Sequence, residues 1–172
     1  REGRQRLAAA FEAVDGHFRR LFATLFDGGQ AHLALVDSDD PLEAGLEIYA
    51  QPPGKRLQSL TLLSGGEQSL VSLALMFAVY RVRSTPFYIL DEVEAALDDT
   101  NLRRLLSYLD SIRGTTQVIM ISHQRRTMEM ADLLYGVSMR SDGVSKLVSQ
   151  KLDQAIRNVS NARDVDSFTG AK

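Results

Sequence analysis

Residues 87–123 read FYILDEVEAALDDTNLRRLLSYLDSIRGTTQVIMISH. The first four, Phe87 to Leu90, are all apolar, a pattern typical of a strand buried on both faces of a sheet. Leucine and isoleucine then recur at helical spacing from Leu102 to Ile112, and Gln117 to Ile121 reads as a second buried strand. Strand, helix and strand of these lengths predict a crossover between parallel strands, whose carboxyl ends lie at the same edge of the sheet.

Four more segments precede this crossover. Apolar residues step by four and three from Leu7 to Leu25 and predict an amphipathic helix that stops at Asp27-Gly28-Gly29. It covers too few heptads to predict more than the stub of a coiled coil. Residues 31–36 and 46–49 have the pattern of a strand and its return strand, and a helix is expected from Gln68 to about Arg83.

The segments after the crossover are simpler. Tyr135 to Met139 and Val144 to Val148 flank Ser141-Asp142-Gly143, which predicts an antiparallel hairpin. From Asp153 onward the chain is polar, and a frayed tail is expected. No repeat or second domain is visible, so the sequence predicts one α/β domain.

Composition narrows the class of protein. With 172 residues, 44% of them apolar, the chain can form a single packed core and is neither disordered nor collagen-like. Its net charge of −2 gives no global attraction to nucleic acid or anionic membranes, so any such binding must be local. The absence of cysteine excludes disulfides and thiolate metal sites, and the most apolar stretch, Leu70 to Tyr80, is too short to span a membrane. We expect a soluble intracellular protein.

Three places carry polar residues suited to chemistry. Asp91-Glu92 directly follows a buried strand, where one carboxylate could hold Mg²⁺ while the other activates water, although an acidic helix start is an equally good interpretation. His123 follows the second strand and could contact a phosphate, or could be an ordinary loop residue. Ser64-Gly65-Gly66-Glu67 has the spacing of a capping box, yet its two glycines would bare backbone N–H groups for a phosphate.

The chain lacks the Gly-rich loop with Gly-Lys and Ser or Thr that normally holds a nucleotide triphosphate. Gly54-Lys55 does not supply it, because Arg56 follows the lysine and two prolines precede the glycine. The loop that holds the phosphates of a nucleotide would have to come from another polypeptide segment.

Four motifs resemble, in type, order and spacing, those of the ABC-type ATPases. They are the signature motif at Leu63-Ser64-Gly65-Gly66-Glu67, the Walker B strand at Phe87 to Glu92, the D-loop at Ala96-Leu97-Asp98 and the switch histidine at Ile121-Ser122-His123. The run from Asp91 to Asn101 narrows the resemblance to the bacterial branch of the structural maintenance of chromosomes (SMC) family. Gln68 and Glu94 depart from that pattern, at positions where a basic residue and Asp are common; this puts surface contacts in doubt more than hydrolysis.

The resemblance implies the C-terminal half of an SMC ATPase head, with a coiled-coil stub at residues 1–26, the C-terminal lobe at 27–152 and a polar tail at 153–172. ATP and Mg²⁺ are the implied cofactors. Asp91 would hold Mg²⁺, Glu92 would activate water and His123 would contact the γ-phosphate. Ser64, Gly65, Gly66 and Glu67 belong to the signature segment that reaches ATP on the opposite head, and Asp98 would join the two sites.

The same resemblance implies several partners: the N-terminal lobe that carries the Walker A loop, a second SMC head, a kleisin subunit at the final hairpin, and DNA, with no membrane. A cytoplasmic, nucleoid-associated protein of chromosome condensation and segregation is expected. Two alternatives stay open: a lobe of another ABC-type ATPase, in DNA repair or transport, and an interaction module that uses ATP as glue. Glu92 argues against the second, because a module that does not hydrolyse ATP needs no base.

Overall fold

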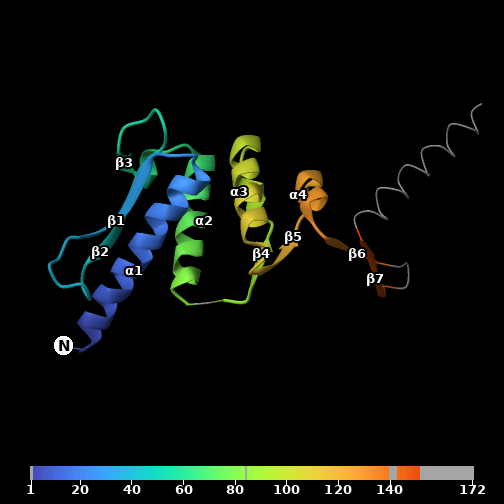
Figure 1. Cartoon of the computed structure of the whole chain (residues 1–172), viewed down its shortest axis with the longest axis horizontal. Helices are drawn as coiled ribbons and strands as arrows, with labels where there is room; N and C mark the ends of the chain where they lie inside the picture. Colours follow the sequence, from blue (N-terminus) through green and yellow to red (C-terminus); the bar gives the residue numbers. More distant parts are fainter. Residues whose placement is uncertain (1, 84, 140–142, 152–172) are drawn as a thin grey trace, which may run out of the picture. The chain divides into compact units, whose positions relative to one another are not determined.

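A computed structural model describes residues 2–83, 85–139 and 143–151. The chain divides into two compact units, residues 1–121 and 122–172, and each is described by itself. The first unit holds the elements from α1 to β5, and the second holds α4, β6 and β7 (Figure 1). The expected tail from Asp153 and the turn residues Ser141 and Asp142 lie outside the described residues. The boundaries 1–26, 27–152 and 153–172 stay a prediction.

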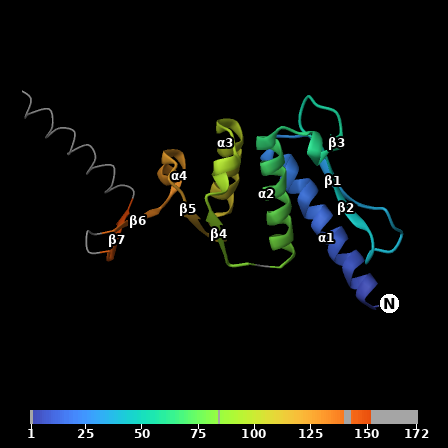
Figure 2. The ribbon, with the colours of Figure 1, turned by 180° about the vertical axis from the view of Figure 1, so that it is seen from behind.

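Helix α1 (Glu2–Leu25) is amphipathic, as its sequence pattern predicts, but only its second half is buried. Phe18 and Phe22 are fully buried there, and the Phe22 ring stacks on that of Phe26 with 4.3 Å between centroids. The helix packs against α2 and β1, which lie on either side of it in both ribbon views (Figures 1 and 2). It ends where Asp27 takes a left-handed conformation before the two glycines.

An antiparallel sheet follows, formed by β1 (Gln30–Val36), β2 (Gly45–Gln51) and the short β3 (Gln58–Ser59). The predicted strand and return strand pair over their whole length. The Leu33 N–H donates to Asp15 Oδ1 of α1 at 2.7 Å, so the helix satisfies a donor on the outer edge of β1. β3, with two residues, is too short to leave a pattern in the sequence.

Helix α2 (Gly65–Val82) follows the 3₁₀ turn η1 (Leu60–Leu62) and begins three residues before the predicted start. Ser64 is its N-cap, so the two glycines form the first turn of the helix. Leu70, Val71, Ala74, Phe77 and Ala78 are buried along it.

The predicted crossover is confirmed. β4 (Phe87–Asp91) and β5 (Gln117–Ile121) are parallel, joined through the 3₁₀ turn η2 (Val93–Ala96) and helix α3 (Asp99–Ile112). They form a two-stranded sheet, whereas the other described sheets are antiparallel, so parallel pairing is a smaller part of the fold than expected.

The prediction that the β4 strand is buried on both faces is wrong for this chain. Tyr88 and Leu90 are buried, with the Tyr88 ring against Phe77 and Tyr80 of α2. Phe87 and Ile89 point the other way and are 48% and 61% exposed. Ile119 and Ile121 of β5 are exposed as well, so one face of this apolar sheet has no cover within the described first unit.

The second unit contains α4 (Arg125–Met130) and the hairpin of β6 (Leu133–Met139) and β7 (Ser145–Lys151). The hairpin is antiparallel, as predicted, and longer than expected; α4 was not expected. The large apolar side chains of Tyr135, Val137 and Leu147 are exposed on it. Nowhere in the described ranges is there a helix with both the length and the apolarity to cross a membrane.

The two faces of β4 give a direct test of the fold. Ile89→Thr removes an exposed apolar side chain and is expected to change the free energy of unfolding by less than about 0.5 kcal/mol, while reducing self-association of the chain. Leu90→Ala, one residue away on the buried face, is expected to cost about 2–5 kcal/mol. Urea unfolding and sedimentation measure both effects. Equal losses of stability would contradict the assignment of the two faces.

Candidate functional site

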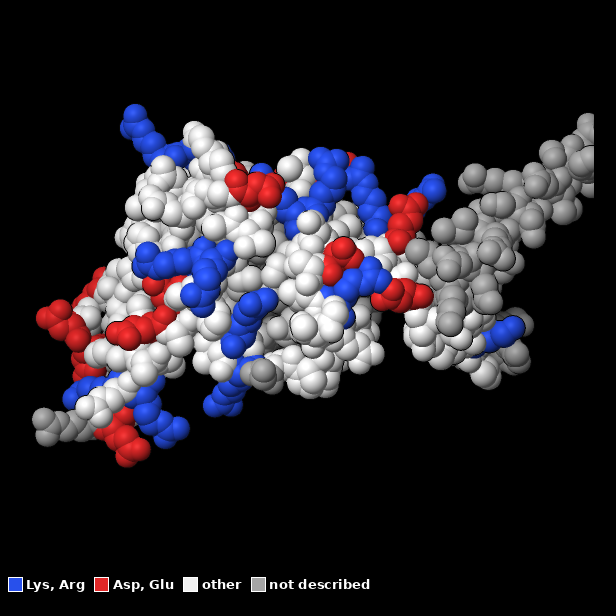
Figure 3. Space-filling view, in the orientation of Figure 1, with Lys and Arg blue, Asp and Glu red and all other residues white. Residues whose placement is uncertain are grey.

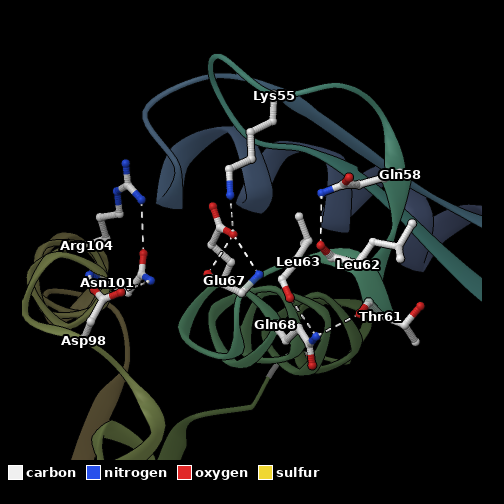
Figure 4. A network of polar contacts seen from close by, with 11 residues as sticks. Lys55, Gln58, Thr61, Leu62, Leu63, Glu67, Gln68, Asp98, Asn101 and Arg104 are labelled. Carbon is white, nitrogen blue, oxygen red and sulfur yellow. Dashed lines mark hydrogen bonds and ion pairs between the residues drawn. The ribbon is translucent and has the colours of Figure 1, made fainter.

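The signature segment is held by Glu67, which closes a capping box with Ser64. Glu67 Oε2 accepts three hydrogen bonds, from the Ser64 N–H at 3.1 Å, from Ser64 Oγ at 2.8 Å and from Lys55 Nζ at 2.8 Å (Figure 4). Partial burial alone would raise the pKa of Glu67, but the hydrogen bonds from Lys55 and Ser64 outweigh it and lower the pKa below its ordinary value. Glu67 is therefore held ionised as part of the helix start.

The same contact explains where the Lys55 side chain lies. The Lys55 N–H donates to the Pro52 carbonyl and closes a turn, and the ammonium reaches across to Glu67. This agrees with the sequence interpretation that Gly54-Lys55 is not a phosphate loop.

The two signature glycines have different surroundings. A Cβ built on Gly66 would lie 3.0 Å from Asp98 Oδ2 and 3.1 Å from Asn101 Nδ2, so these side chains occupy the space of its missing side chain. A Cβ on Gly65 would meet nothing within 4 Å. The first turn of α2 is thus in contact with the start of α3 at Gly66 and open at Gly65.

Asp98 is the N-cap of α3. Its Oδ1 accepts from the Asn101 N–H at 2.8 Å and its Oδ2 from Asn101 Nδ2 at 3.1 Å. Asn101 is buried, and its own amide oxygen accepts from Arg104 at 3.1 Å (Figure 4). Sequence reasoning did not single out Asn101 or Arg104; the spacing of three from an N-cap aspartate is the signal that could have found Asn101.

Gln68, one of the two departures from the SMC pattern, has a local role. Its side-chain amide donates to the Leu63 carbonyl at 2.9 Å and to the Thr61 carbonyl at 3.3 Å (Figure 4). A neutral amide therefore ties the loop before the signature segment to α2.

Asp91 is the last residue of β4 and Glu92 follows it directly; both residues are exposed. Glu92 takes a left-handed conformation (φ 46°, ψ 30°), which costs a residue with a side chain of the order of 1–3 kcal/mol. Two backbone hydrogen bonds hold it: its N–H donates to the Ile121 carbonyl at 2.9 Å, and the Ala95 N–H donates to its carbonyl at 3.0 Å. Strain of this kind is common where a side chain must be presented for function.

No group of three or more His, Asp or Glu residues within the described residues could hold a metal ion alone. Mg²⁺ in nucleotide sites is usually held by one or two carboxylates together with substrate phosphates, so such a site need not contain a group of this kind. Asp91 is an exposed carboxylate at the carboxyl end of a parallel strand and suits that part.

His123 belongs to the second unit. The turn that contains it is fixed by a hydrogen bond from the Gln124 N–H to Ser122 Oγ at 3.0 Å, directly before α4. The other histidines have partners in the first unit: the His32 ring stacks on Tyr49, and His17 Nδ1 lies 3.1 Å from Arg20 Nη2.

Glu94, the second departure from the SMC pattern, is not the surface residue that the sequence analysis expected. It lies in η2, only 1% exposed, and neither of its carboxylate oxygens has a hydrogen-bond partner among the described residues. A glutamate in a 3₁₀ turn gives no sequence signal of burial, because its neighbours in space come from other elements.

Comparison with known proteins identifies the family. Residues 29–146 match the RecF/RecN/SMC N terminal domain, and the chain belongs to this family. It is 50% identical over 156 residues to the chromosome partition protein Smc of Mycobacterium tuberculosis, with 88% of this chain matched. It spans about 13% of the length of that relative.

A shorter relative also exists. An uncharacterized protein of Rhodospirillum rubrum, named for its place in the 3′ region of the ATPase CF(0) subunits, is 57% identical over 157 residues. The match covers 90% of this chain and 91% of that protein.

Two solved structures show the same fold in SMC heads. One, from work on ATP-driven dimerization and DNA-stimulated activation of SMC ATPases, has a TM-score of 0.80 at 38% identity and covers 93% of this chain and 97% of the other. An SMC head bound to the C-winged helix domain of ScpA has a TM-score of 0.74 at 42% identity, covering 86% of this chain and 46% of the other. The fold is therefore that of an SMC ATPase head.

The different surroundings of the two glycines predict different effects of alanine. Gly65→Ala is expected to leave the stability of the chain unchanged or slightly raised, because alanine favours the helix and meets nothing. Gly66→Ala is expected to be less stable than Gly65→Ala by about 1–3 kcal/mol, because its methyl group presses on Asp98 and Asn101. Urea unfolding measures the difference; equal stabilities would show that Asp98 moves freely.

The buried carboxylate of Glu94 predicts a stabilising substitution. Glu94→Leu keeps a similar side-chain volume, removes two unpaired buried oxygens, and is expected to raise the free energy of unfolding by about 1–3 kcal/mol. Glu43→Leu, at an exposed position, serves as the control and should change little. Destabilisation of Glu94→Leu would show that the carboxylate has a polar partner in solution.

Proposed function

We propose that the chain forms the C-terminal lobe of an SMC ATPase head and takes part in ATP hydrolysis that opens and closes a clamp around DNA in chromosome condensation and segregation. One observation carries the proposal most directly: the exposed Glu92, held in a left-handed conformation at the carboxyl end of a parallel strand. Family membership supports it, as does the position of the signature segment at the first turn of α2.

The hydrolytic part of the site would consist of Asp91, Glu92 and His123. Asp91 would bind Mg²⁺, which when present neutralises charge on the phosphates. Glu92 would orient the attacking water and accept its proton, and His123 would donate to the γ-phosphate. Two adjacent carboxylates suit these two roles, because Asp91 would stay bound to the metal ion while Glu92 exchanges a proton with the water.

The signature segment would face the nucleotide bound to a second head. Ser64 and Gly65 are exposed, and a Cβ on Gly65 would meet nothing within 4 Å, so this turn would leave room for a phosphate to approach its backbone N–H groups. Gly66 and Glu67 would fix this turn from within the lobe, and Asp98, in contact with Gly66, would transmit its position to α3. Pairing of two heads through ATP would then depend on the exposed Ser64 and Gly65. It would also depend on the contacts of Gly66, Glu67 and Asp98, which hold this turn in place.

The N-terminal lobe with the Walker A loop is the proposed partner for the uncovered face of β4 and β5. Parallel sheets are normally covered on both faces, and Phe87, Ile89, Ile119 and Ile121 are exposed on one. The chain also lacks a phosphate loop of its own. The N-terminal lobe would both cover this face of the sheet and supply the phosphate loop.

The β6–β7 hairpin is the proposed kleisin contact. Tyr135, Val137 and Met139 alternate along β6 and are 61%, 73% and 74% exposed, an unusual density of large apolar side chains on one short strand. The similar SMC head bound to the winged-helix domain of ScpA supports a partner of this kind. A cytoplasmic, nucleoid-associated location is proposed on the same grounds of family.

Glu92→Gln tests the proposed base. In the chain combined with the N-terminal lobe, the substitution is expected to leave nucleotide binding intact and to slow hydrolysis by about 10²–10⁴-fold, because the amide keeps the shape and loses the basicity. Pairs of heads should accumulate with ATP, measured by sedimentation alongside phosphate release.

Glu43→Gln, an exposed carboxylate in the turn between β1 and β2, is the matched control and should hydrolyse ATP at the normal rate. The chain without the N-terminal lobe should show no turnover, since it has no phosphate loop. Normal hydrolysis by Glu92→Gln would remove Glu92 from this role, and ATP-dependent pairing without any hydrolysis by the unsubstituted protein would favour a module that uses ATP as glue.

A further inference from the structure

A series of side-chain contacts in the first unit runs from the end of α1, through α3, to the first turn of α2. Arg104 Nη1 donates to Asn101 Oδ1 at 3.1 Å, and Asn101 Nδ2 donates to Asp98 Oδ2 at 3.1 Å (Figure 4). At one end, the guanidinium carbon of Arg104 lies 5.4 Å from the ring centroid of Phe26, which directly follows α1. At the other end, Asp98 Oδ2 and Asn101 Nδ2 are the atoms nearest to a Cβ built on Gly66.

The two neighbours of the Asn101 side chain hold its amide in one orientation. A guanidinium can only donate hydrogen bonds, and a carboxylate can only accept them. Arg104 therefore requires the amide oxygen on its side, and Asp98 requires the amide nitrogen on the other. A reversed amide would bring donors together at Arg104 and acceptors together at Asp98. Because Asn101 is only 3% exposed, the loss of either partner would leave a buried polar group unpaired.

Arg104 is itself anchored at the end of α1. Phe26 is fully buried, its ring stacks on that of Phe22, and its N–H donates to the Phe22 carbonyl at 2.9 Å. The guanidinium is attracted by the quadrupole of this fixed ring. The Asp27 carboxylate, 4.0 Å from Arg104 Nε, is 85% exposed and contributes little. The position of Arg104 therefore depends mainly on Phe26 and Asn101.

Arg104 differs from the basic residues of the molecular surface. Figure 3 shows lysine and arginine side chains that extend away from the surface of the molecule. Only 27% of the Arg104 side chain is exposed. Arg103, one residue earlier on α3, is exposed and makes a hydrogen bond of 3.3 Å to Thr100 on its own helix. Arg103 is therefore a matched control for Arg104.

We propose that Asn101 and Arg104 are positioning residues of the site at which ATP is held between two heads. They hold the Asp98 carboxylate against Gly66, and so keep the first turn of α2 where the signature segment would meet the nucleotide. The inference rests on the proposed function, and neither residue is expected to touch the nucleotide. Neither belongs to the four ATPase motifs of the sequence.

A first measurement tests the link itself, in the full chain and without ATP. The methyl group of Gly66→Ala would press on Asp98 and Asn101, so its cost depends on how firmly these side chains are held. Arg104→Met removes the donor to Asn101, and methionine has nearly the helix propensity of arginine. The decrease in the urea midpoint caused by Gly66→Ala is expected to be smaller by about half in the Arg104→Met background. In the Arg103→Met background it should be unchanged.

A second measurement uses the chain combined with the N-terminal lobe. Arg104→Met is expected to lower kcat for ATP hydrolysis by about 10- to 100-fold, because a displacement of about 1 Å in a positioned group can cost about 100-fold. KM for ATP should change by less than about twofold, because the lost contact would act after the nucleotide has bound to the Walker A loop. Arg104→Lys keeps a cation that can donate to Asn101 and should restore most of the rate. Arg103→Met should hydrolyse ATP normally.

Asn101→Asp is the second variant and replaces Arg104→Met if that variant does not fold. It keeps the size of the side chain and the backbone N–H that Asp98 caps, but it places an acceptor against the Asp98 carboxylate. Its kcat is expected to fall as far as that of Arg104→Met, again with little change in KM. Thermal unfolding of each variant shows that the fold is kept. Loss of stability alone would produce neither this split between kcat and KM nor rescue by lysine.

The link is overturned if Gly66→Ala shifts the urea midpoint equally in the unsubstituted, Arg103→Met and Arg104→Met backgrounds. The positioning role is overturned if Arg104→Met and Asn101→Asp hydrolyse ATP at the normal rate, or if Arg103→Met loses as much activity as Arg104→Met. Absence of hydrolysis by the unsubstituted protein would overturn the proposed function and, with it, any role of these residues in hydrolysis. The urea comparison would not change in that case, so the two failures are distinguishable.

Discussion

The contact between Gly66 and Asp98 is the constraint on which the arrangement of the candidate site depends. The Asp98 carboxylate caps α3 and, in the same position, occupies the space where a side chain on Gly66 would lie. The first turns of α2 and α3 are therefore fixed against each other through one side chain. Because Asp98 also ends the turn that follows Asp91 and Glu92, the signature segment and the end of β4 belong to one connected framework.

The signature segment could act both as a capping box and as a phosphate-binding turn, because the two roles would use different atoms. Glu67 has its carboxylate engaged by Ser64 and Lys55, and Gly66 is accounted for by close approach of Asp98. Gly65 is the signature glycine that contacts within the lobe do not explain. The proposed phosphate contact therefore rests on Gly65, a distinction that the sequence Gly-Gly could not make.

The crossover was predictable from sequence because its signals are local: an apolar run, leucines at helical spacing and a second apolar run. Burial was less so. Phe87 and Ile89 are of residue types common in cores but are exposed, because no described element of the first unit covers that face of β4. Glu94 has the composition of a surface residue but is buried by elements distant in sequence. Short elements such as β3 and α4 have too few residues to show a period.

The backbone of Glu92 connects the candidate base to the strand that leads to His123. A left-handed glutamate persists only where its surroundings hold it, and here the Ile121 carbonyl accepts its N–H. Ile121 is the last residue of β5, and Ser122 and His123 follow it directly. A displacement at the end of β5 would therefore lengthen the hydrogen bond that holds Glu92 and release its strain.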